Sequence, residues 1–275
     1  MTIFQSVILG LIEGLTEFLP ISSTAHLIVA SSWLQLAESE FVKNFLISIQ
    51  LGAILSVAVL YFKTIIKNPK LILKIAAAFI PTAIIGLLAY ELIKNVLMES
   101  LLIIASALIL GGIALIILEK KFFKTNTSKE ELKNINGTKT ELINAHDETL
   151  NDINYKQAVL VGVFQALAVI PGVSRSAATI MGGLSLRISR KNIVEFSFLL
   201  ALPTMLAATV YDLYKSPLSF SSQEVTVWII GLIVSFVTAV LGIKFFLKFI
   251  KKHSFVGFGW YRIIIGIIIL VYLFK

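Results

Sequence analysis

The chain has 275 residues, of which 57% are hydrophobic and only 15% are charged. Soluble domains carry about 25% charged residues, so this composition indicates that a lipid bilayer surrounds the protein. The net charge of +8 does not indicate nucleic-acid binding, because the basic residues form short clusters between apolar runs, and the lack of cysteine excludes a disulfide framework and a thiolate metal site.

The first apolar segment, residues 2–34, is interrupted near its middle by Pro20. Each half has about 12 to 17 residues, which is too short to cross a bilayer comfortably. Proline removes a backbone donor and clashes with the preceding turn, so we expect two half-helices that meet at a bend. Because hydrocarbon cannot satisfy free backbone groups, this bend must lie inside the protein or beside a water-filled cavity.

Three uninterrupted apolar stretches follow, and then a polar stretch, 119–156, that mixes many lysines with many acids. A second interrupted segment, 157–190, breaks at Pro171 and Gly172, and three more apolar stretches complete the chain. The sequence therefore predicts an all-α polytopic membrane protein with six transmembrane helices and two broken re-entrant helix hairpins. The six predicted spans are 41–62, 75–93, 100–118, 193–213, 225–246 and 257–274.

The order of these elements repeats, since a broken segment and three spans occur twice. Glu13 aligns with Gln165, and Pro20 aligns with Pro171. Because three is an odd number of spans, the chain reaches the opposite side of the membrane before the second copy begins, so the second copy must be inverted. The polar site is expected near the midplane, where the two broken segments meet. We expect a single integral membrane domain, 1–275. Its parts are a first inverted repeat 1–118, a linker 119–156 and a second inverted repeat 157–275.

Loop charge predicts the orientation, because lysine and arginine favour the cytoplasmic side. The connections expected to be cytoplasmic carry basic clusters: 63–74, 187–191 and 244–252. The connections expected to face outward contain acids together with lysine: 36–43, 91–99 and 212–224. The linker is then a flexible cytoplasmic connection with some helix. If both broken segments are re-entrant, both termini lie outside.

Glu13 and Glu17 stand four residues apart, so on a helix they share one face. Like charges repel there, and a charged side chain in the middle of a membrane helix costs about 2.5 to 3.5 kcal/mol. The compensation could be a divalent cation with oxygen ligands, which would also bridge phosphate oxygens. It could equally be one protonated carboxyl group or a partnership with Arg175. The spacing leaves these three interpretations open.

After the first bend, Ser22 and Ser23 precede His26 by four and three residues, so either hydroxyl can reach the imidazole on a helix. A hydroxyl beside a base is the minimal activated nucleophile. Serine after a proline is equally a common helix N-cap, so a capping role for the pair also remains open. Together with Thr24, this stretch places three hydroxyls at the start of the second half-helix.

The second bend carries a cluster of polar side chains at the start of a half-helix: Ser174, Arg175, Ser176 and Thr179. Free N–H groups and the positive end of the helix dipole attract anions, and a guanidinium binds phosphate oxygens bidentately. The two bends are therefore complementary. Their common ligand is expected to be a phosphate or diphosphate on a molecule that lives in the membrane, with Ser22 and Thr24 also facing the phosphate.

The stretches EGLTEFLPISSTAH at 13–26 and PGVSRSAAT at 171–179 resemble the two signature motifs of the bacterial undecaprenyl-diphosphate phosphatase family, the bacitracin-resistance type. The stretches QLG at 50–52 and FSFLLALP at 196–203 also match, so the resemblance covers essentially the whole chain. By motif position, Glu13 and Glu17 match the family's acidic pair. Ser23 and His26 match its proposed nucleophile and base. The residues that match its phosphate-binding positions are Ser174, Arg175 and Thr179.

The resemblance implies a hydrolase that cleaves the phosphoanhydride of undecaprenyl diphosphate and releases inorganic phosphate, which recycles the lipid carrier for peptidoglycan synthesis. Bacitracin sequesters the same diphosphate, so resistance would follow from the activity. The resemblance also implies a multi-pass protein of the bacterial cytoplasmic (inner) membrane, with its site open to the outer, periplasmic face. It further implies a divalent cation, Mg²⁺ or Ca²⁺, held by Glu13 and Glu17.

Two mechanisms remain open from the residues. In one, Ser23 attacks the terminal phosphorus and His26 removes its proton. In the other, His26 or Glu17 activates water and Ser23 only binds phosphate. The competing class of function is a secondary transporter or flippase of an anionic lipid, because inverted repeats and broken helices are common in transporters. The sequence also leaves open whether the chain forms a homodimer.

Overall fold

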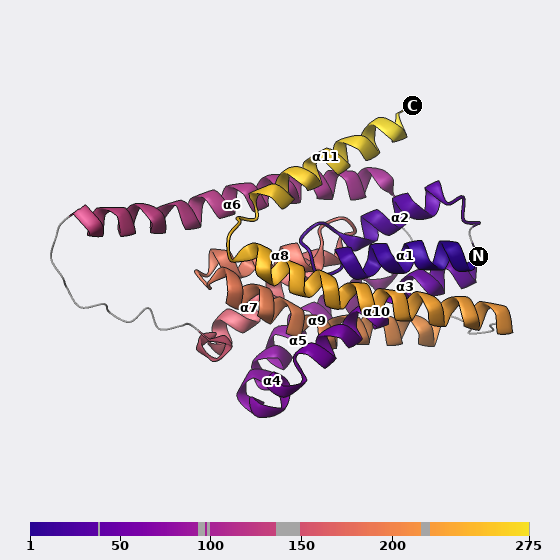
Figure 1. Ribbon diagram of the computed structural model, residues 1–275, viewed down its shortest axis with the longest axis horizontal. Helices are drawn as coiled ribbons and strands as arrows, with labels where there is room; N and C mark the ends of the chain where they lie inside the picture. Colours follow the sequence, from indigo (N-terminus) through magenta and orange to yellow (C-terminus); the bar gives the residue numbers. More distant parts are fainter. Residues whose placement is uncertain (38, 93–96, 98–99, 136–148, 216–220, 275) are drawn as a thin grey trace.

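A computed structural model describes residues 1–37, 39–92, 97, 100–135, 149–215 and 221–274. These residues form helices and turns, without a β-strand, and six of their helices are long and apolar enough to cross a bilayer. The predicted all-α polytopic membrane fold is thereby confirmed. The six helices are α3 (Glu40–Leu60), α5 (Pro69–Leu92), α6 (Leu101–Ile135), α9 (Arg190–Lys215), α10 (Ser222–Ile250) and α11 (Val256–Leu273) (Figure 1).

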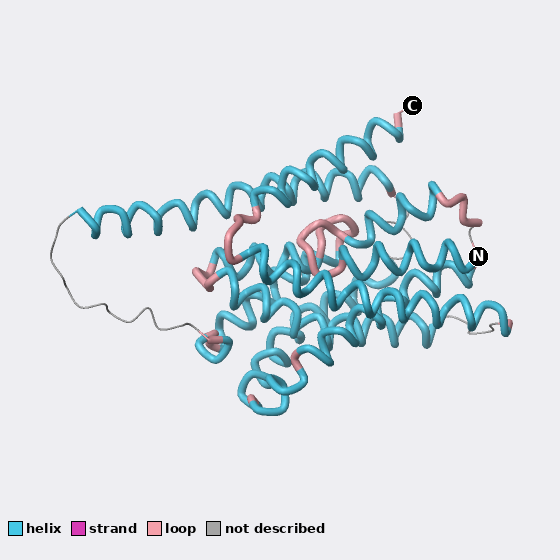
Figure 2. Tube along the Cα trace, in the orientation of Figure 1, coloured by secondary structure: helices cyan, strands magenta, loops and turns pink. Residues whose placement is uncertain are grey.

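Both interrupted segments consist of two half-helices, as the prolines predict. The first contains α1 (Ile3–Thr16) and α2 (Ser23–Trp33). The second contains α7 (Tyr155–Ala166), the short 3-10 helix η3 (Leu167–Val169) and α8 (Arg175–Ser185). The two chain breaks are drawn as loops near the centre of the molecule (Figure 2). The two bends, with the polar residues of the two motifs, therefore lie inside the helical bundle.

The two breaks share an unusual backbone geometry. Ser22 caps α2 with a φ of 71°, and Ser174 caps α8 with a φ of 70°. Residues other than glycine rarely adopt a positive φ. In each bend the serine hydroxyl accepts a hydrogen bond from a backbone N–H in the first turn, that of Ala25 or Ala177. The capping interpretation thus holds for Ser22, and it leaves the hydroxyl of Ser23 free for another partner.

Helix α6 continues beyond residue 118, where the predicted span ended, because Glu119 finds buried partners. Its carboxylate pairs with Arg190 at the start of α9 and accepts a hydrogen bond from the backbone N–H of Phe255. The predicted linker contains the end of α6 and the 3-10 helix η2 (Leu150–Asp152), and its residues 136–148 lie outside the described part. Parts of the predicted outward connections, residues 38, 93–96, 98–99 and 216–220, also lie outside it.

The helices pair reciprocally between the two halves of the chain. Helix α1 packs along α10, and α7 packs along α5, so each broken segment lies against a spanning helix of the other half. Helices α3 and α9 pack against each other, as do α6 and α11 (Figure 1). Close approach of α1 to α10 requires Gly10 and Gly14, where a Cβ atom would collide with the backbone of α10. This pairing agrees with the predicted inverted repeat, whose boundaries stay a prediction.

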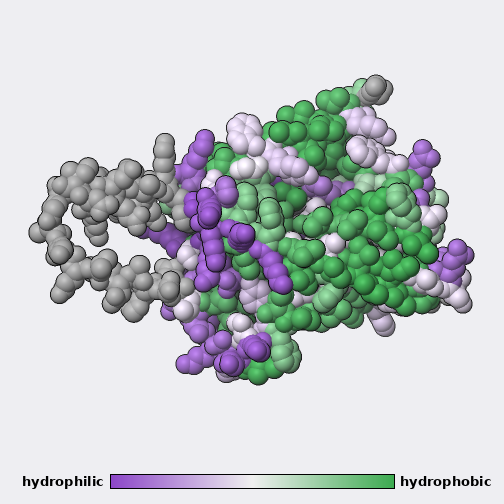
Figure 3. Space-filling view, viewed as in Figure 1, coloured by the Kyte–Doolittle hydropathy of each residue, from purple (hydrophilic) through white to green (hydrophobic). Residues whose placement is uncertain are grey.

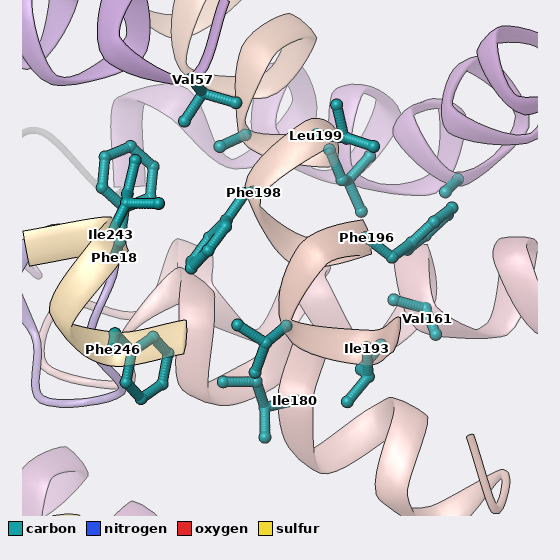
Figure 4. Packing of buried hydrophobic residues seen from close by; sticks show 14 of the residues in the cluster. Phe18, Val57, Val161, Ile180, Ile193, Phe196, Phe198, Leu199, Ile243 and Phe246 are labelled. Carbon is teal, nitrogen blue, oxygen red and sulfur yellow. The ribbon is translucent and has the colours of Figure 1, made fainter. Parts of the chain in front are cut away.

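The largest buried cluster lies around α9 and reaches the first bend. Phe18 and Phe198 pack edge to face with ring centroids 5.3 Å apart, and both are fully buried (Figure 4). Phe246 of α10 lies 6.1 Å from Phe198, measured between ring centroids. Because Phe18 follows Glu17 directly, burial of its ring fixes the backbone that carries the acid.

The outer surface is apolar over the middle of the molecule. Large side chains such as Leu88, Leu110 and Val210 are exposed, as expected where helices contact lipid. In Figure 3, hydrophobic residues cover the middle of the visible face and hydrophilic residues gather toward its ends. With its six spanning helices, this apolar surface makes the chain a multi-pass membrane protein.

Both termini lie toward the same end of the molecule. In Figure 1, α1 begins and α11 ends on the side away from the end of α6, which loop charge predicts to be cytoplasmic.

Replacing Gly162 by alanine is expected to destabilise the protein. A Cβ atom at this position of α7 would collide with the backbone carbonyl of Ala78 in α5. Overpacking of this kind typically costs about 1 to 3 kcal/mol, so the midpoint of thermal unfolding in detergent should fall. Gly257→Ala is the matched control, because a Cβ there meets no atom within 4 Å. Equal unfolding midpoints for the two variants would contradict the close packing of α7 on α5.

Candidate active site

A cavity of about 620 Å³ lies where the two bends meet. Glu17, Ser22, Ser23 and Thr24 line it from the first bend. Ser174 and Arg175 line it from the second. Residues about 150 positions apart in the sequence thus share one cavity, and the complementary groups predicted for the two bends face each other.

Glu17 connects the predicted nucleophile with the predicted phosphate-binding arginine. Its Oε2 atom accepts a hydrogen bond of 2.5 Å from the hydroxyl of Ser23. Its Oε1 atom lies 3.0 Å from Nη2 of Arg175. Charge-assisted hydrogen bonds of this length are among the stronger ones in proteins. The carboxylate is therefore placed both to accept a proton from Ser23 and to neutralise the arginine while no anion is bound.

Arg175 is held from several sides. Its Nη1 atom donates to the backbone carbonyl and the hydroxyl of Ser197 on α9, at 2.9 and 3.3 Å. Its guanidinium carbon lies 5.6 Å from the centre of the Phe18 ring. The Nε atom is buried without a hydrogen-bond partner among the described residues. The guanidinium is therefore oriented by the protein, and its Nε–H group makes no hydrogen bond among the described residues.

Two other predicted phosphate-binding residues have different partners. The hydroxyl of Ser176 donates to the carbonyl of Phe18 at 3.0 Å, which ties the second bend to the first. The hydroxyl of Thr179 lies 2.6 Å from that of Ser197 and donates to backbone carbonyls of its own helix. Both side chains are fully buried and do not line the cavity within the described residues. Their contacts support the backbone and the arginine.

His26 lies outside the cavity, and its ring nitrogens are bound to groups other than Ser23. Nδ1 lies 2.7 Å from the carbonyl oxygen of Ser22, and Nε2 lies 2.6 Å from the hydroxyl of Tyr261 on α11. The His26 and Tyr261 rings are nearly parallel, with centroids 5.5 Å apart. In this arrangement the group in contact with the Ser23 hydroxyl is Glu17.

Glu13 lies on α1 one turn before Glu17, the C-cap of that helix; it is fully buried and is not among the described residues that line the cavity. Both of its carboxyl oxygens lack a hydrogen-bond partner among the described residues. A carboxyl group in this state fits a bound cation or a proton. The described residues contain no group of three or more histidine, aspartate or glutamate side chains placed around one metal position. Any cation here would therefore draw its remaining ligands from elsewhere.

The cavity extends from the polar bends between α5 and α9. Its walls there are mainly apolar, with Phe79 and Leu87 on α5 and Met205 on α9. At its far end, Tyr90 donates a hydrogen bond of 2.8 Å to Asp212. A cavity with charged groups at one end and apolar walls beyond fits an amphiphile with an anionic head.

The sequence analysis missed several residues that shape this site. Ser197 orients Arg175, and Gln165 bridges Thr82 and Thr204 in the wall of the cavity, at 3.0 and 2.9 Å. The alignment of Gln165 with Glu13 could have pointed to this side chain. Ser197 stands in the FSFLLALP stretch that matches the family, but residue type alone gives a serine in an apolar helix no role, since serines often bond their own backbone there.

Comparison with known proteins identifies the family. Residues 6–268 match the model of the family described as bacitracin resistance protein BacA. The undecaprenyl-diphosphatase of Aquifex aeolicus is 47% identical over 98% of this chain and 97% of its own length. That of Wolinella succinogenes is 47% identical over 99% of both chains, and that of Flavobacterium johnsoniae is 44% identical over 98% of this chain and 96% of its own. The chain therefore belongs to the BacA family of bacitracin resistance proteins.

Proposed function

We propose that this chain is an undecaprenyl-diphosphatase, a membrane hydrolase that converts undecaprenyl diphosphate to undecaprenyl phosphate and inorganic phosphate. One observation supports it most: the Ser23 hydroxyl, the Glu17 carboxylate and the Arg175 guanidinium are bonded in a row on the wall of a cavity between membrane helices. This row combines a nucleophile, a base and an anion-binding group, which phosphoryl transfer requires. The apolar extension of the cavity suits part of the isoprenyl chain.

In the proposed first step, the Ser23 oxygen attacks the terminal phosphorus while Glu17 accepts the hydroxyl proton. The bond between this phosphorus and the bridging oxygen breaks, and undecaprenyl phosphate leaves with the electron pair. Arg175 exchanges its contact with Glu17 for the phosphate oxygens and stabilises the charge that develops on them. The free N–H groups at the starts of α2 and α8, with Ser22, Thr24 and Ser174 beside them, orient the same oxygens.

Before the proposed second step, Glu17 passes the proton it took from Ser23 to the departing undecaprenyl phosphate. Water then attacks the phosphoserine, and Glu17 removes a proton from this water and returns it to the Ser23 oxygen. The phosphorus–oxygen bond to Ser23 breaks, the serine regains a proton, and inorganic phosphate leaves. The alternative in which Glu17 activates water directly uses the same residues without a covalent intermediate. The short hydrogen bond between Ser23 and Glu17 favours the covalent route, because it places base and nucleophile in contact before substrate binds.

The proposed cation, Mg²⁺ or Ca²⁺, would be held by Glu13 and Glu17. The two unpartnered oxygens of Glu13 support this assignment. Mg²⁺ in particular is commonly bound by one or two carboxylates together with substrate phosphates and water, which suits a site with only two acidic side chains. When bound, the cation would neutralise charge on the phosphate oxygens.

The proposed location is the bacterial cytoplasmic membrane, with the cavity open to the outer face and both termini outside. The basic connections 63–74 and 187–191 support this orientation. Tyr90 and Asp212 line the end of the cavity near the predicted outward connections of α5 and α9.

The direct test is release of inorganic phosphate from undecaprenyl diphosphate by the purified protein in detergent. We expect phosphate to accumulate with undecaprenyl phosphate in a ratio of one to one. Absence of phosphate release, combined with movement of the lipid across vesicle membranes, would support the secondary transporter or flippase instead. Absence of both would contradict either function.

Treatment with a chelator is expected to lower phosphate release, because the phosphate oxygens and the negative charge of Glu13 and Glu17 would then lack the cation that neutralises them. Addition of excess Mg²⁺ or Ca²⁺ should restore the rate. The measurement is the initial rate before and after each addition. Full activity in the chelator after prolonged dialysis would contradict the proposed cation.

Arg175→Lys is expected to lower kcat for phosphate release about 100-fold, since lysine keeps the charge and loses the fork that orients two phosphate oxygens. The matched control is Arg187→Lys, because Arg187 is exposed at the end of α8. Both variants should fold, but Arg175→Lys should unfold at a somewhat lower temperature than the control, because lysine cannot replace the buried bonds to Glu17 and Ser197 together. A kcat for Arg175→Lys equal to that of the control would rule out phosphate binding by Arg175.

A further inference from the structure

Arg262 is a second arginine inside the bundle, and it has no part in the mechanism above. It lies in the apolar helix α11 and is fully buried. A buried charge in a membrane helix is costly and usually marks a functional constraint. Arg262 does not line the cavity within the described residues, so direct contact with the substrate does not explain it.

All hydrogen bonds of Arg262 among the described residues run to backbone carbonyl oxygens. Nη1 donates to Pro20 at 3.2 Å, and Nη2 donates to Gly172 at 3.0 Å. Nη2 also donates to Ala107 at 3.2 Å, and Nε donates to Leu108 at 3.4 Å. One guanidinium thus joins the first bend, the second bend and helix α6.

The two bend carbonyls lie at the chain breaks, where helical hydrogen bonds cannot form. Pro20 is the proline that interrupts the first segment, and Gly172, with a φ of 93°, follows the proline of the second. Unsatisfied carbonyls inside a membrane protein are expensive, and Arg262 supplies a donor to each. The planar fork keeps these donors at a fixed separation.

The neighbouring helix is shaped to admit this guanidinium. A Cβ atom at Gly111 of α6 would collide with Nη2 of Arg262. A Cβ atom at Gly112 would meet the Cβ of Arg262 and the backbone of Gly259. The consecutive glycines therefore allow α11 to approach α6 closely enough for the guanidinium to reach both bends.

We infer that Arg262 is a positioning residue for the phosphatase reaction, one that holds the Ser23 bend and the Arg175 bend at the separation that a single phosphate group requires. This inference rests on the proposed function. The ion pair between Glu17 and Arg175 also joins the bends, but it must open when Arg175 turns to the phosphate. The hydrogen bond from Ser176 to the carbonyl of Phe18 joins them at a second point, whereas Arg262 bonds both bends and α6 at once. Arg262 lies behind the cavity, so its hydrogen bonds persist through the reaction.

The kinetic test compares Arg262→Lys with the wild type. Lysine keeps the charge but offers its donors from one atom, so it cannot bond both bends and α6 in the same way. Small misplacements of catalytic groups can cost about 100-fold in rate, so we expect kcat to fall by about that factor while KM changes little. Gly111→Ala displaces the guanidinium without removing it and should also lower kcat. Gly257→Ala, on the same helix as Arg262, is the control and should not.

Chemical rescue separates positioning from general loss of structure. Arg262→Gly leaves a space of the shape of the missing group, and free guanidinium at concentrations below those that denature should raise its kcat. The same addition should not raise the kcat of Arg175→Lys, in which the side chain still fills the space. Wild-type kcat in Arg262→Lys, or failure of guanidinium to restore a folded Arg262→Gly protein, would overturn the inference.

A distance measurement tests the positioning role of Arg262 independently of enzymatic activity. The chain has no cysteine, so two can be introduced at exposed positions beside the bends, Leu15 and Ile170, and labelled with nitroxides. We expect a narrow distance distribution with Arg262 and a broader or shifted one with Arg262→Lys. An unchanged distribution would overturn the inference even in a protein that releases phosphate. A changed distribution without phosphate release in the wild type would count against the proposed function alone.

Discussion

Glu17→Gln is expected to lower kcat for phosphate release about 10⁴-fold. The amide cannot accept the proton of Ser23, and a positioned general base contributes about 10² to 10⁴ in rate. The same change removes the negative charge opposite Arg175, at 3.0 Å in the structure, so the arginine would lose its ion pair while keeping its bonds to Ser197. The loss should appear mainly in kcat, since the isoprenyl chain and the other phosphate contacts are retained.

The matched control for this variant is Glu40→Gln. Glu40 also pairs with a cation, Lys43 at 3.7 Å, but this pair is exposed at the start of α3. Exposed pairs of this kind contribute less than about 1 kcal/mol to stability, so the control should keep its activity and its unfolding temperature. A Glu17→Gln protein that is folded and retains more than about one tenth of the wild-type kcat would exclude Glu17 as the base.

Hydropathy and proline position predicted the membrane fold because each depends on local chemistry. A run of about 20 apolar residues has few alternatives to a spanning helix. Pro20 and Pro171 lie at the two breaks, where the missing N–H group favours an interruption. Pro81 and Pro203 lie inside the continuous helices α5 and α9, so a proline by itself does not end a helix. The helix boundaries were less predictable, as α6 shows. Glu119 can be buried in that helix because Arg190, far along the chain, pairs with it.

The partnership of Glu17 with Arg175 was predictable in kind, because two buried acids need a positive partner. The hydrogen-bond partner of Ser23 was not predictable from the sequence. Its spacing from His26 established only that the two could share a helical face. The positive φ of Ser22 bends the chain so that the Ser23 hydroxyl meets Glu17 across the break, while the His26 ring bonds the Ser22 carbonyl. Such a backbone conformation leaves no pattern in the residue types of a non-glycine position.

Arg262 could have been singled out from the sequence as a candidate functional residue. A single arginine in an apolar run of α11 is itself unusual. Its role depends on the three chain segments that surround it, so the sequence can flag the residue without naming its partners. The bends supply the reacting groups, and the distance between them depends on a residue near the carboxyl end of the chain.

Ser23→Ala is expected to reduce phosphate release about 10³-fold or more, because alanine cannot form the proposed phosphoserine. Removing a nucleophile leaves only the rate supplied by binding and charge stabilisation. The wild type, mixed with substrate labelled in the terminal phosphate and quenched rapidly in acid, should carry label on the protein, and Ser23→Ala should carry none. Ser39→Ala, at the exposed start of α3, is the control and should be labelled like the wild type. A Ser23→Ala protein with near-wild-type turnover would exclude the covalent route and leave direct attack by water, with Glu17 as its base.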